Sequence, residues 1–136
     1  MKKKYLVTGG SGFIGSALVK KLLNEGHSVR VFDNNSRGNL RRLESVIDQI
    51  EFVEGDIRDL AQVEDACKDI DAVCHLAFVN GTKFFYELPE LVLEVGVKGM
   101  MNILDACIAH SIDDLILASS SEVYQSPDEV PTSENV

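Results

Sequence analysis

The stretch TGGSGFIGSALVKKL, residues 8–22, decides the fold of this chain. Four glycines occupy its first eight positions, and an apolar run with helical periodicity follows them. The preceding KYLVT, residues 4–8, is a short apolar run that predicts a buried strand. From Phe13 the apolar period becomes that of a helix, which ends at Gly26. The helix face that we expect to be buried carries Ile14, Ala17, Leu18 and Leu22.

The glycines of this stretch form a G-x-G-x-x-G pattern, Gly10, Gly12 and Gly15, at the junction of the predicted strand and helix. In this context they allow a tight turn and a close approach of the backbone to a pyrophosphate, which the N–H groups of the helix N-terminus also favour. Asp33 follows Gly15 at the spacing of a carboxylate that binds an adenosine ribose. The pattern predicts a dinucleotide site. Because a carboxylate there repels a 2′-phosphate, it favours NAD over NADP.

Two observations leave alternatives to an NAD site open. A glycine-rich turn and an ordinary aspartate at a strand end can occur together without any ligand. Arg37, shortly after Asp33, is a residue type that serves a 2′-phosphate in NADP sites. We expect NAD because the strand, the helix and the acidic residue occur together in the required order.

Segments typical of strands and helices alternate along the rest of the chain. Such an alternation implies right-handed crossovers and a parallel sheet with helices on both faces. We therefore expect one α/β domain, residues 1–136, with a doubly wound parallel sheet (Rossmann-type) of about five strands. The further strands are predicted at 28–33, 50–55, 71–77 and 115–121, and the further helices at 40–46, 60–68 and 89–110.

The segment 89–110 carries the longest helical pattern, with apolar residues on more than one face. A helix that is apolar around much of its girth is buried on two sides. We expect one face to pack on the sheet and the other on a partner subunit or on chain outside this sequence. A homodimer through this helix is the predicted assembly.

Composition limits the remaining classes of function. The chain has 136 residues, 45% of them hydrophobic, which suffices for one domain with a core. Its formal net charge of -9 argues against nucleic acid or an anionic membrane as the main partner. No signal-peptide pattern and no long apolar span occur, so a soluble protein is expected. Cys67, Cys74 and Cys107 lack metal-ligand spacing, which predicts reduced core thiols, a cytoplasmic location and no metal site.

Five short motifs together resemble those of the extended short-chain dehydrogenase/reductase family, the NAD-dependent nucleotide-sugar epimerases and dehydratases. They are TGGSGFIG at 8–15, FDN at 32–34, GDIRD at 55–59, CHLA at 74–77 and SSSEVY at 119–124. The resemblance extends over essentially the whole chain. It implies an enzyme that moves a hydride from a sugar carbon to NAD, through a keto-sugar intermediate, and back.

The resemblance also implies roles for single residues. Ser120 would contact the substrate, because a hydroxyl both donates and accepts hydrogen bonds. Glu122 would be an additional acid or base, or else a solvated loop carboxylate. His75 lies inside an apolar strand and is interpreted as a satisfied core histidine. The cofactor would contact Gly9, Gly12, Phe13, Ile14 and Gly15 along the pyrophosphate, Asp33 and Asn34 at the adenine ribose, Asp56 and Ile57 at the adenine, and Leu76 and Ala77 at the nicotinamide-side ribose.

The sequence departs from the family pattern at two places. Gly96 occupies a position where the family usually has an asparagine, and a glycine also weakens a helix by roughly 0.5–1 kcal/mol relative to alanine. A packing reason or a divergent site is implied. The three tyrosines, Tyr5, Tyr86 and Tyr124, each lack a lysine four residues later, so the family's Tyr-x-x-x-Lys pair for proton transfer is absent. We expect a truncated chain, inactive by itself, without the C-terminal substrate domain.

The leading hypothesis is the NAD-binding portion of a nucleotide-sugar epimerase or dehydratase. An alternative is a non-catalytic dinucleotide-binding module or sensor, which Gly96 and the missing pair favour and which Ser120 disfavours. A reductase of the same family that acts on a non-sugar ketone is a third hypothesis.

Overall fold

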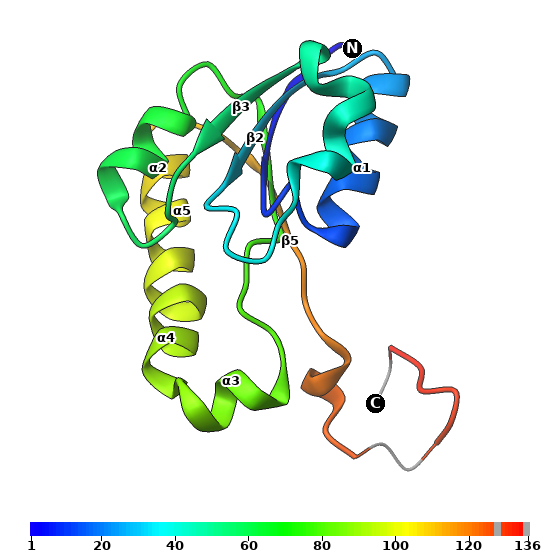
Figure 1. Ribbon diagram of the computed structural model, residues 1–136, viewed down its shortest axis with the longest axis vertical. Coiled ribbons are helices and arrows are strands. Elements are labelled where there is room, and N and C mark those ends of the chain that lie inside the picture. The colour runs from blue at the N-terminus through cyan, green and yellow to red at the C-terminus, as the bar shows by residue number, and fades with distance from the viewer. Residues whose placement is uncertain (127–128, 135–136) are drawn as a thin grey trace.

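The computed structural model describes residues 1–126 and 129–134, and a parallel sheet forms its centre (Figure 1). In the described residues the sheet has five strands, in the order β3-β2-β1-β4-β5, and all neighbours are parallel. This confirms the predicted fold class. The strands are β1 (Lys4–Thr8), β2 (Ser28–Asp33), β3 (Ile50–Glu54), β4 (Ala72–His75) and β5 (Asp114–Leu117).

Helices cover both faces of the sheet, and each face has its own apolar core (Figure 1). Successive residues of a strand point to opposite faces, so Leu6 lies in one core and Val7 in the other. One face carries α1 (Phe13–Asn24) and the 3-10 helix η1 (Leu40–Gln49). The other carries α2 (Leu60–Ala66), α4 (Pro89–Leu93), the π-helical turn η2 (Glu94–Lys98) and α5 (Gly99–Ala109). Two short elements, α3 (Thr82–Glu87) and the 3-10 helix η3 (Ser121–Tyr124), lie beyond the carboxyl ends of the strands.

The strands β4 and β5 are shorter than predicted. Of the expected strand 71–77 only Ala72–His75 is paired, and the expected strand 115–121 ends at Leu117. The reason lies in β1, which ends at Thr8 where the glycine turn begins. Beyond that point β4 has no partner on the side of β1, and the residues after His75 leave the sheet at its carboxyl edge.

The buried face of α1 also differs from the prediction. Its buried residues are Gly15, Ser16 and Val19, whereas Ile14 is 68% exposed and Ala17 is exposed. The first turn of α1 borders the cleft described below, so Ile14 lies on an open surface. Gly15 faces the glycine turn instead. Only the later residues of the expected face, Leu18 and Leu22, pack partly against the core.

The helix predicted at 89–110 is a continuous run of α4, η2 and α5 that ends at Ala109. A π-helical turn occupies its middle, and such turns occur often at functional sites. Asn102 on α5 donates to the backbone oxygen of Ile57 at 2.8 Å and so ties this helix to the chain after β3. Neither this helix nor another one in the described part of the chain is long and apolar enough to cross a membrane.

The three cysteines are buried and unpaired, as the sequence predicted. Cys67 and Cys107 belong to the core beneath α2 and α5, and Cys74 to the core beneath α1. Burial raises the pKa of the Cys67 thiol to about 12 and raises the pKa of the other two thiols above the ordinary value. The thiols are therefore protonated and unreactive in the folded protein.

Candidate functional site

A cleft of about 480 Å³ opens at the carboxyl edge of the sheet. The glycine turn after β1 forms part of it, and the segments that follow β2, β3 and β4 form the rest. All the residues that were predicted to contact a cofactor line this cleft, although their contacts with a ligand stay a prediction. They are Gly9, Gly12, Phe13, Ile14, Gly15, Asp33, Asn34, Asp56, Ile57, Leu76 and Ala77.

The glycine turn leaves the N-terminus of α1 free to bind an anion. Gly12 is the N-cap of α1, no side chain caps the helix, and its first turn carries no acidic residue. The first N–H groups of a helix have no partner within the helix, and they carry its positive dipole end. Gly9 has a φ of +69°, and a Cβ there would lie 2.9 Å from the backbone N of Ala77. The turn therefore requires glycine both for its conformation and for its close approach to the segment after β4.

Asp33 is held in place by two backbone N–H groups. Its Oδ2 accepts from the N–H of Ser11 at 2.9 Å, and its Oδ1 accepts from the N–H of Asn35 at 2.8 Å. The side chain is largely buried, with the residue only 8% exposed, yet it lines the cleft. A carboxylate can accept about four hydrogen bonds, so both oxygens keep capacity for the hydroxyl groups of a ligand.

Ser11 is a residue of this site that the sequence did not single out. It is fully buried, and its hydroxyl donates to Oδ1 of Asn35 at 3.0 Å. A Cβ on Gly38 would lie 1.7 Å from Oγ of Ser11, so the loop after β2 packs directly on the glycine turn. The glycine in the polar loop NNSRGN was the only local signal for this contact.

Two arginines line the cleft on the side of Asp33, and both are already bound to backbone carbonyl groups. Arg42 donates from Nη1 to the carbonyl of Ser11 at 3.2 Å. Arg37 donates to the carbonyl of Asn80, and its guanidinium lies 5.3 Å from the ring centroid of Phe84. The side chain of Arg37 thus joins the loop after β2 to the segment after β4.

Asp56, after β3, is bound by Arg58. The guanidinium donates to both oxygens of the Asp56 carboxylate, with distances from 2.6 to 3.1 Å, and also to Glu94 at 2.9 Å. These hydrogen bonds lower the pKa of the Asp56 carboxyl below its ordinary value. Asp56 is therefore ionised at neutral pH, and Arg58 links the chain after β3 to the π-helical turn.

His75 is a buried histidine with one defined hydrogen-bond partner. Its Nδ1 lies 2.7 Å from Oγ1 of Thr8, which also accepts from the N–H groups of Leu76 and Ala77 at 3.2 Å each. Two amides use the lone pairs of the hydroxyl, so its only proton points to Nδ1, and the ring carries its own proton on Nε2. Burial lowers the pKa of His75 to about 4. The burial of the ring and the hydrogen bond at Nδ1 agree with the predicted core histidine.

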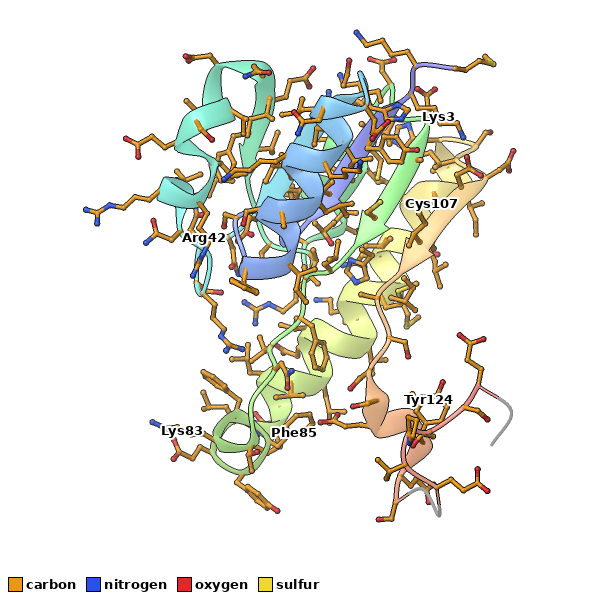
Figure 2. The ribbon with its side chains drawn as sticks, turned by 90° about the vertical axis from the view of Figure 1, so that its right-hand side faces the viewer. Lys3, Arg42, Lys83, Phe85, Cys107 and Tyr124 are labelled. Carbon is orange, nitrogen blue, oxygen red and sulfur yellow. The ribbon has the colours of Figure 1, made fainter. Side chains whose placement is uncertain are left out.

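The two predicted catalytic residues lie outside the cleft lining. Ser120 is the N-cap of η3, and its Oγ accepts from the N–H of Glu122 at 3.3 Å. Both residues are exposed, and Ala118 is the cleft residue nearest to them in the sequence. Figure 2 shows Tyr124, the last residue of η3, far from Arg42 of the cleft. Their roles in catalysis stay a prediction.

The cleft also has an apolar side whose residues were not predicted to be part of a site. Phe78 and Val79 follow β4, and Val95 comes from the π-helical turn. Val95 was expected on an apolar face of the helix 89–110, whereas Phe78 and Val79 fell outside every predicted element. These residues come together only because α4 and α5 pack against the sheet. The local sequence does not indicate this packing.

Comparisons with known proteins agree with this architecture. The model of the NAD dependent epimerase/dehydratase family matches residues 5–136. The UDP-N-acetyl-alpha-D-glucosaminuronate decarboxylase of Bacillus cytotoxicus is 36% identical over 91% of this chain and 38% of its own. The UDP-glucose 4-epimerase of Corynebacterium glutamicum is 33% identical over 98% of this chain and 40% of its own. The crystal structure of the Brucella ovis UDP-glucose 4-epimerase in complex with NAD superposes with a TM-score of 0.88 and 32% identity, over 98% of this chain and 40% of that one. The chain thus spans about two fifths of the length of these relatives.

Proposed function

The chain belongs to the NAD-dependent epimerase/dehydratase family, and from this premise we propose that residues 1–136 are the NAD-binding portion of a nucleotide-sugar epimerase or dehydratase. One observation carries the proposal. The uncapped N-terminus of α1 and the carboxylate of Asp33 line one cleft at the carboxyl edge of a parallel sheet. That edge is where open α/β sheets bind dinucleotides.

The residues of the cleft fit NAD. The first N–H groups of α1 would bind the pyrophosphate, and Asp33 would accept hydrogen bonds from the hydroxyl groups of the adenine ribose. Arg37 is bound to the Asn80 carbonyl and lies against Phe84, which supports NAD rather than NADP. Bound NAD supplies a reversible acceptor for the hydride of a sugar carbon.

Ser120 and Glu122 are proposed to act on the substrate rather than on the cofactor. The Ser120 hydroxyl would orient a sugar hydroxyl or keto oxygen, and Glu122 would exchange a proton with it. Residues 1–136 contain no Tyr-x-x-x-Lys pair, so we expect this stretch by itself to bind NAD without turnover.

A non-catalytic dinucleotide-binding module is the second candidate function. The positions of Ser120 and Glu122 outside the cleft lining favour it. Both candidates require NAD binding, so turnover of a nucleotide-sugar by the whole protein discriminates between them. In the assay the whole protein is incubated with NAD and a panel of nucleotide-sugars, and the sugar products are analysed, because a hydride that returns to the sugar leaves no net NADH.

The first test of the proposal is the variant Asp33→Asn. The amide keeps the shape of the side chain but loses the negative charge and one acceptor atom. We expect NAD binding to weaken about 10- to 100-fold, because hydrogen bonds to a charged group contribute about 1.5–3 kcal/mol. The preference for NAD over NADP should fall as well, since the charge that repels a 2′-phosphate is gone. Isothermal titration calorimetry with both dinucleotides measures the two effects.

The matched control for this test is Asp48→Asn, which makes the same change on the exposed surface of η1. It should bind both dinucleotides like the unmodified protein. If Asp33 had a purely structural role, Asp33→Asn would weaken the binding of NAD and of NADP by the same factor. That result, or unchanged NAD binding, would contradict the role assigned to Asp33.

We further propose that the protein forms a homodimer through the helix of α4, η2 and α5. The helix exposes apolar side chains at spacings of three and four residues, which places them on one face. Their exposed fractions run from 41% to 78%. In a dimer with two-fold symmetry, the same face of the helix in a second copy would cover these side chains. We call this face the apolar stripe; its residues are Leu93, Val97, Met101, Leu104 and Ile108.

The variant Met101→Glu tests the dimer. It places a charge at the middle of the apolar stripe, and burying an unpaired charge costs several kcal/mol. We expect the dissociation constant of the dimer to rise about a hundredfold. Sedimentation velocity over a range of protein concentrations measures this change. Gln49→Glu adds the same charge at the end of η1 and should leave the association unchanged; equal effects of the two variants would rule out the stripe as the interface.

A cytoplasmic location is also proposed. Three unpaired thiols, all buried in the core, suit a reducing compartment. Fractionation of cells that express the tagged protein tests this proposal.

A further inference from the structure

The continuous run of η2 and α5 has glycines at two positions where it packs against residues that line the cleft. A Cβ on Gly96 would lie 2.8 Å from Cε2 of Phe78, and a Cβ on Gly99 would lie 2.5 Å from Cδ1 of Ile57. Gly96 lies in the π-helical turn and Gly99 begins α5, and at each of them a side chain from another segment occupies the space of the missing Cβ. Phe78 and Ile57 lie directly on the backbone of the helix there. For Gly96 this contact is a packing reason, one of the two explanations that the sequence implied.

Phe78 and Ile57 both line the cleft, and so does Val95, which lies beside Gly96 in the π-helical turn. Val95 and Ile57 are buried, whereas Phe78 is 48% exposed. Phe78 lies in the segment after β4, where no strand pairing holds the chain. Its ring is therefore positioned by the helix on one side and has free surface on the other.

We propose that Gly96 and Phe78 act together in binding the cofactor. The absence of a side chain at position 96 lets the Phe78 ring pack on the helix backbone, and in this position the ring forms an apolar surface against which bound NAD packs. This inference rests on the proposed function. Phe78 is the binding residue and Gly96 the positioning residue. Because the helix backbone blocks the ring on one side, a side chain at position 96 displaces the ring into the cleft. Gly96 thus sets the width of the cleft through Phe78.

A double-mutant cycle tests this pair. The NAD dissociation constant is measured by calorimetry for the unmodified protein, Phe78→Ala, Gly96→Asn and the double variant. Phe78→Ala should weaken binding about 5- to 10-fold through the loss of apolar contact. Gly96→Asn should weaken it about 10- to 30-fold, because the displaced ring also occupies ligand space. In the double variant the substitution at 96 should add less than about 2-fold to the effect of Phe78→Ala, since no ring remains to be displaced.

The control for a general effect on the helix is Lys98→Asn, an exposed position of the same π-helical turn. It should bind NAD normally. Thermal unfolding identifies any variant that does not fold, and Gly96→Ala, which adds only the Cβ, replaces Gly96→Asn in the cycle in that case.

Two results would overturn the inference while leaving the proposed function intact. One is normal NAD binding by Phe78→Ala. The other is a double variant whose loss equals the product of the two single losses, which would show that Gly96 and Phe78 act independently. Failure of the unmodified protein to bind NAD would instead overturn the proposed function, and this inference with it.

Discussion

Replacement of Gly15 by alanine is expected to destabilise the protein by about 3 kcal/mol. A Cβ on Gly15 would lie 2.2 Å from the carbonyl oxygen of Gly9 and 2.7 Å from Cα of Gly10. Both are backbone atoms of the same tight turn, so no side chain can rotate away to make room. The turn must open or α1 must move off the sheet. Urea denaturation followed by circular dichroism measures the loss.

Two other glycines provide matched controls for Gly15→Ala. Gly26 has a φ of +84° and no atom within 4 Å of a Cβ, so Gly26→Ala carries only the strain of the left-handed backbone, about 1–2 kcal/mol. A Cβ on Gly12 would have one neighbour within 4 Å, the Gly9 carbonyl oxygen at 3.0 Å. Gly12→Ala should therefore destabilise the protein less than Gly15→Ala. If Gly15→Ala were no less stable than Gly26→Ala, the close packing of α1 on the glycine turn would not limit stability.

The second large effect is a loss of stability at mildly acid pH that depends on His75. Burial lowers the pKa of this ring to about 4 in the folded protein, whereas an unfolded histidine has a pKa near 6.5. Between these values the unfolded chain binds more protons, so the free energy of unfolding falls as the pH falls. The stabilising contribution is fully present above about pH 6.5 and is lost down to about pH 4. The total is about 3 kcal/mol, at about 1.4 kcal/mol per pH unit.

The variant His75→Asn isolates this contribution. Its Oδ1 can accept the proton of the Thr8 hydroxyl in place of Nδ1, but the amide does not titrate. We expect lower stability than the unmodified protein at pH 7, because the smaller side chain leaves a cavity, and a smaller difference at pH 4.5. Carboxylates with lowered pKa, such as Asp56, titrate in both proteins and cancel in the comparison. Chemical denaturation at several pH values measures both curves, and parallel curves would contradict the assignment.

Much of the fold follows from local sequence. The strands 4–8 and 28–33 have the bounds that were predicted, because short apolar runs between turn residues have few other stable conformations. The glycine pattern, the acidic residue after it and the helix could also be predicted, since each depends on a local requirement of the backbone. The buried face of α1 was predicted less well. Periodicity identifies an apolar face but does not indicate that Ile14 borders a cleft.

The residues of the site were likewise predicted only in part. The glycine turn and Asp33 were predicted from their spacing, and the other cleft residues that were predicted, such as Asp56, were implied by the family resemblance. Contacts between distant segments were not predicted. Ser11 packs against Gly38, Arg37 contacts Phe84, and Phe78 lies on Gly96 only because crossover connections bring these segments together.

The sequence by itself therefore determined the fold class, the position of the glycine turn and the carboxylate beside it. These depend on backbone geometry and hydrophobic periodicity, which act over a few residues. Only the tertiary structure decided which ring nitrogen of His75 carries the proton, which groups Arg37 contacts and why position 96 is a glycine. Each of these depends on the packing of side chains from segments far apart in the chain, and close packing leaves no trace in the local pattern of any one of them.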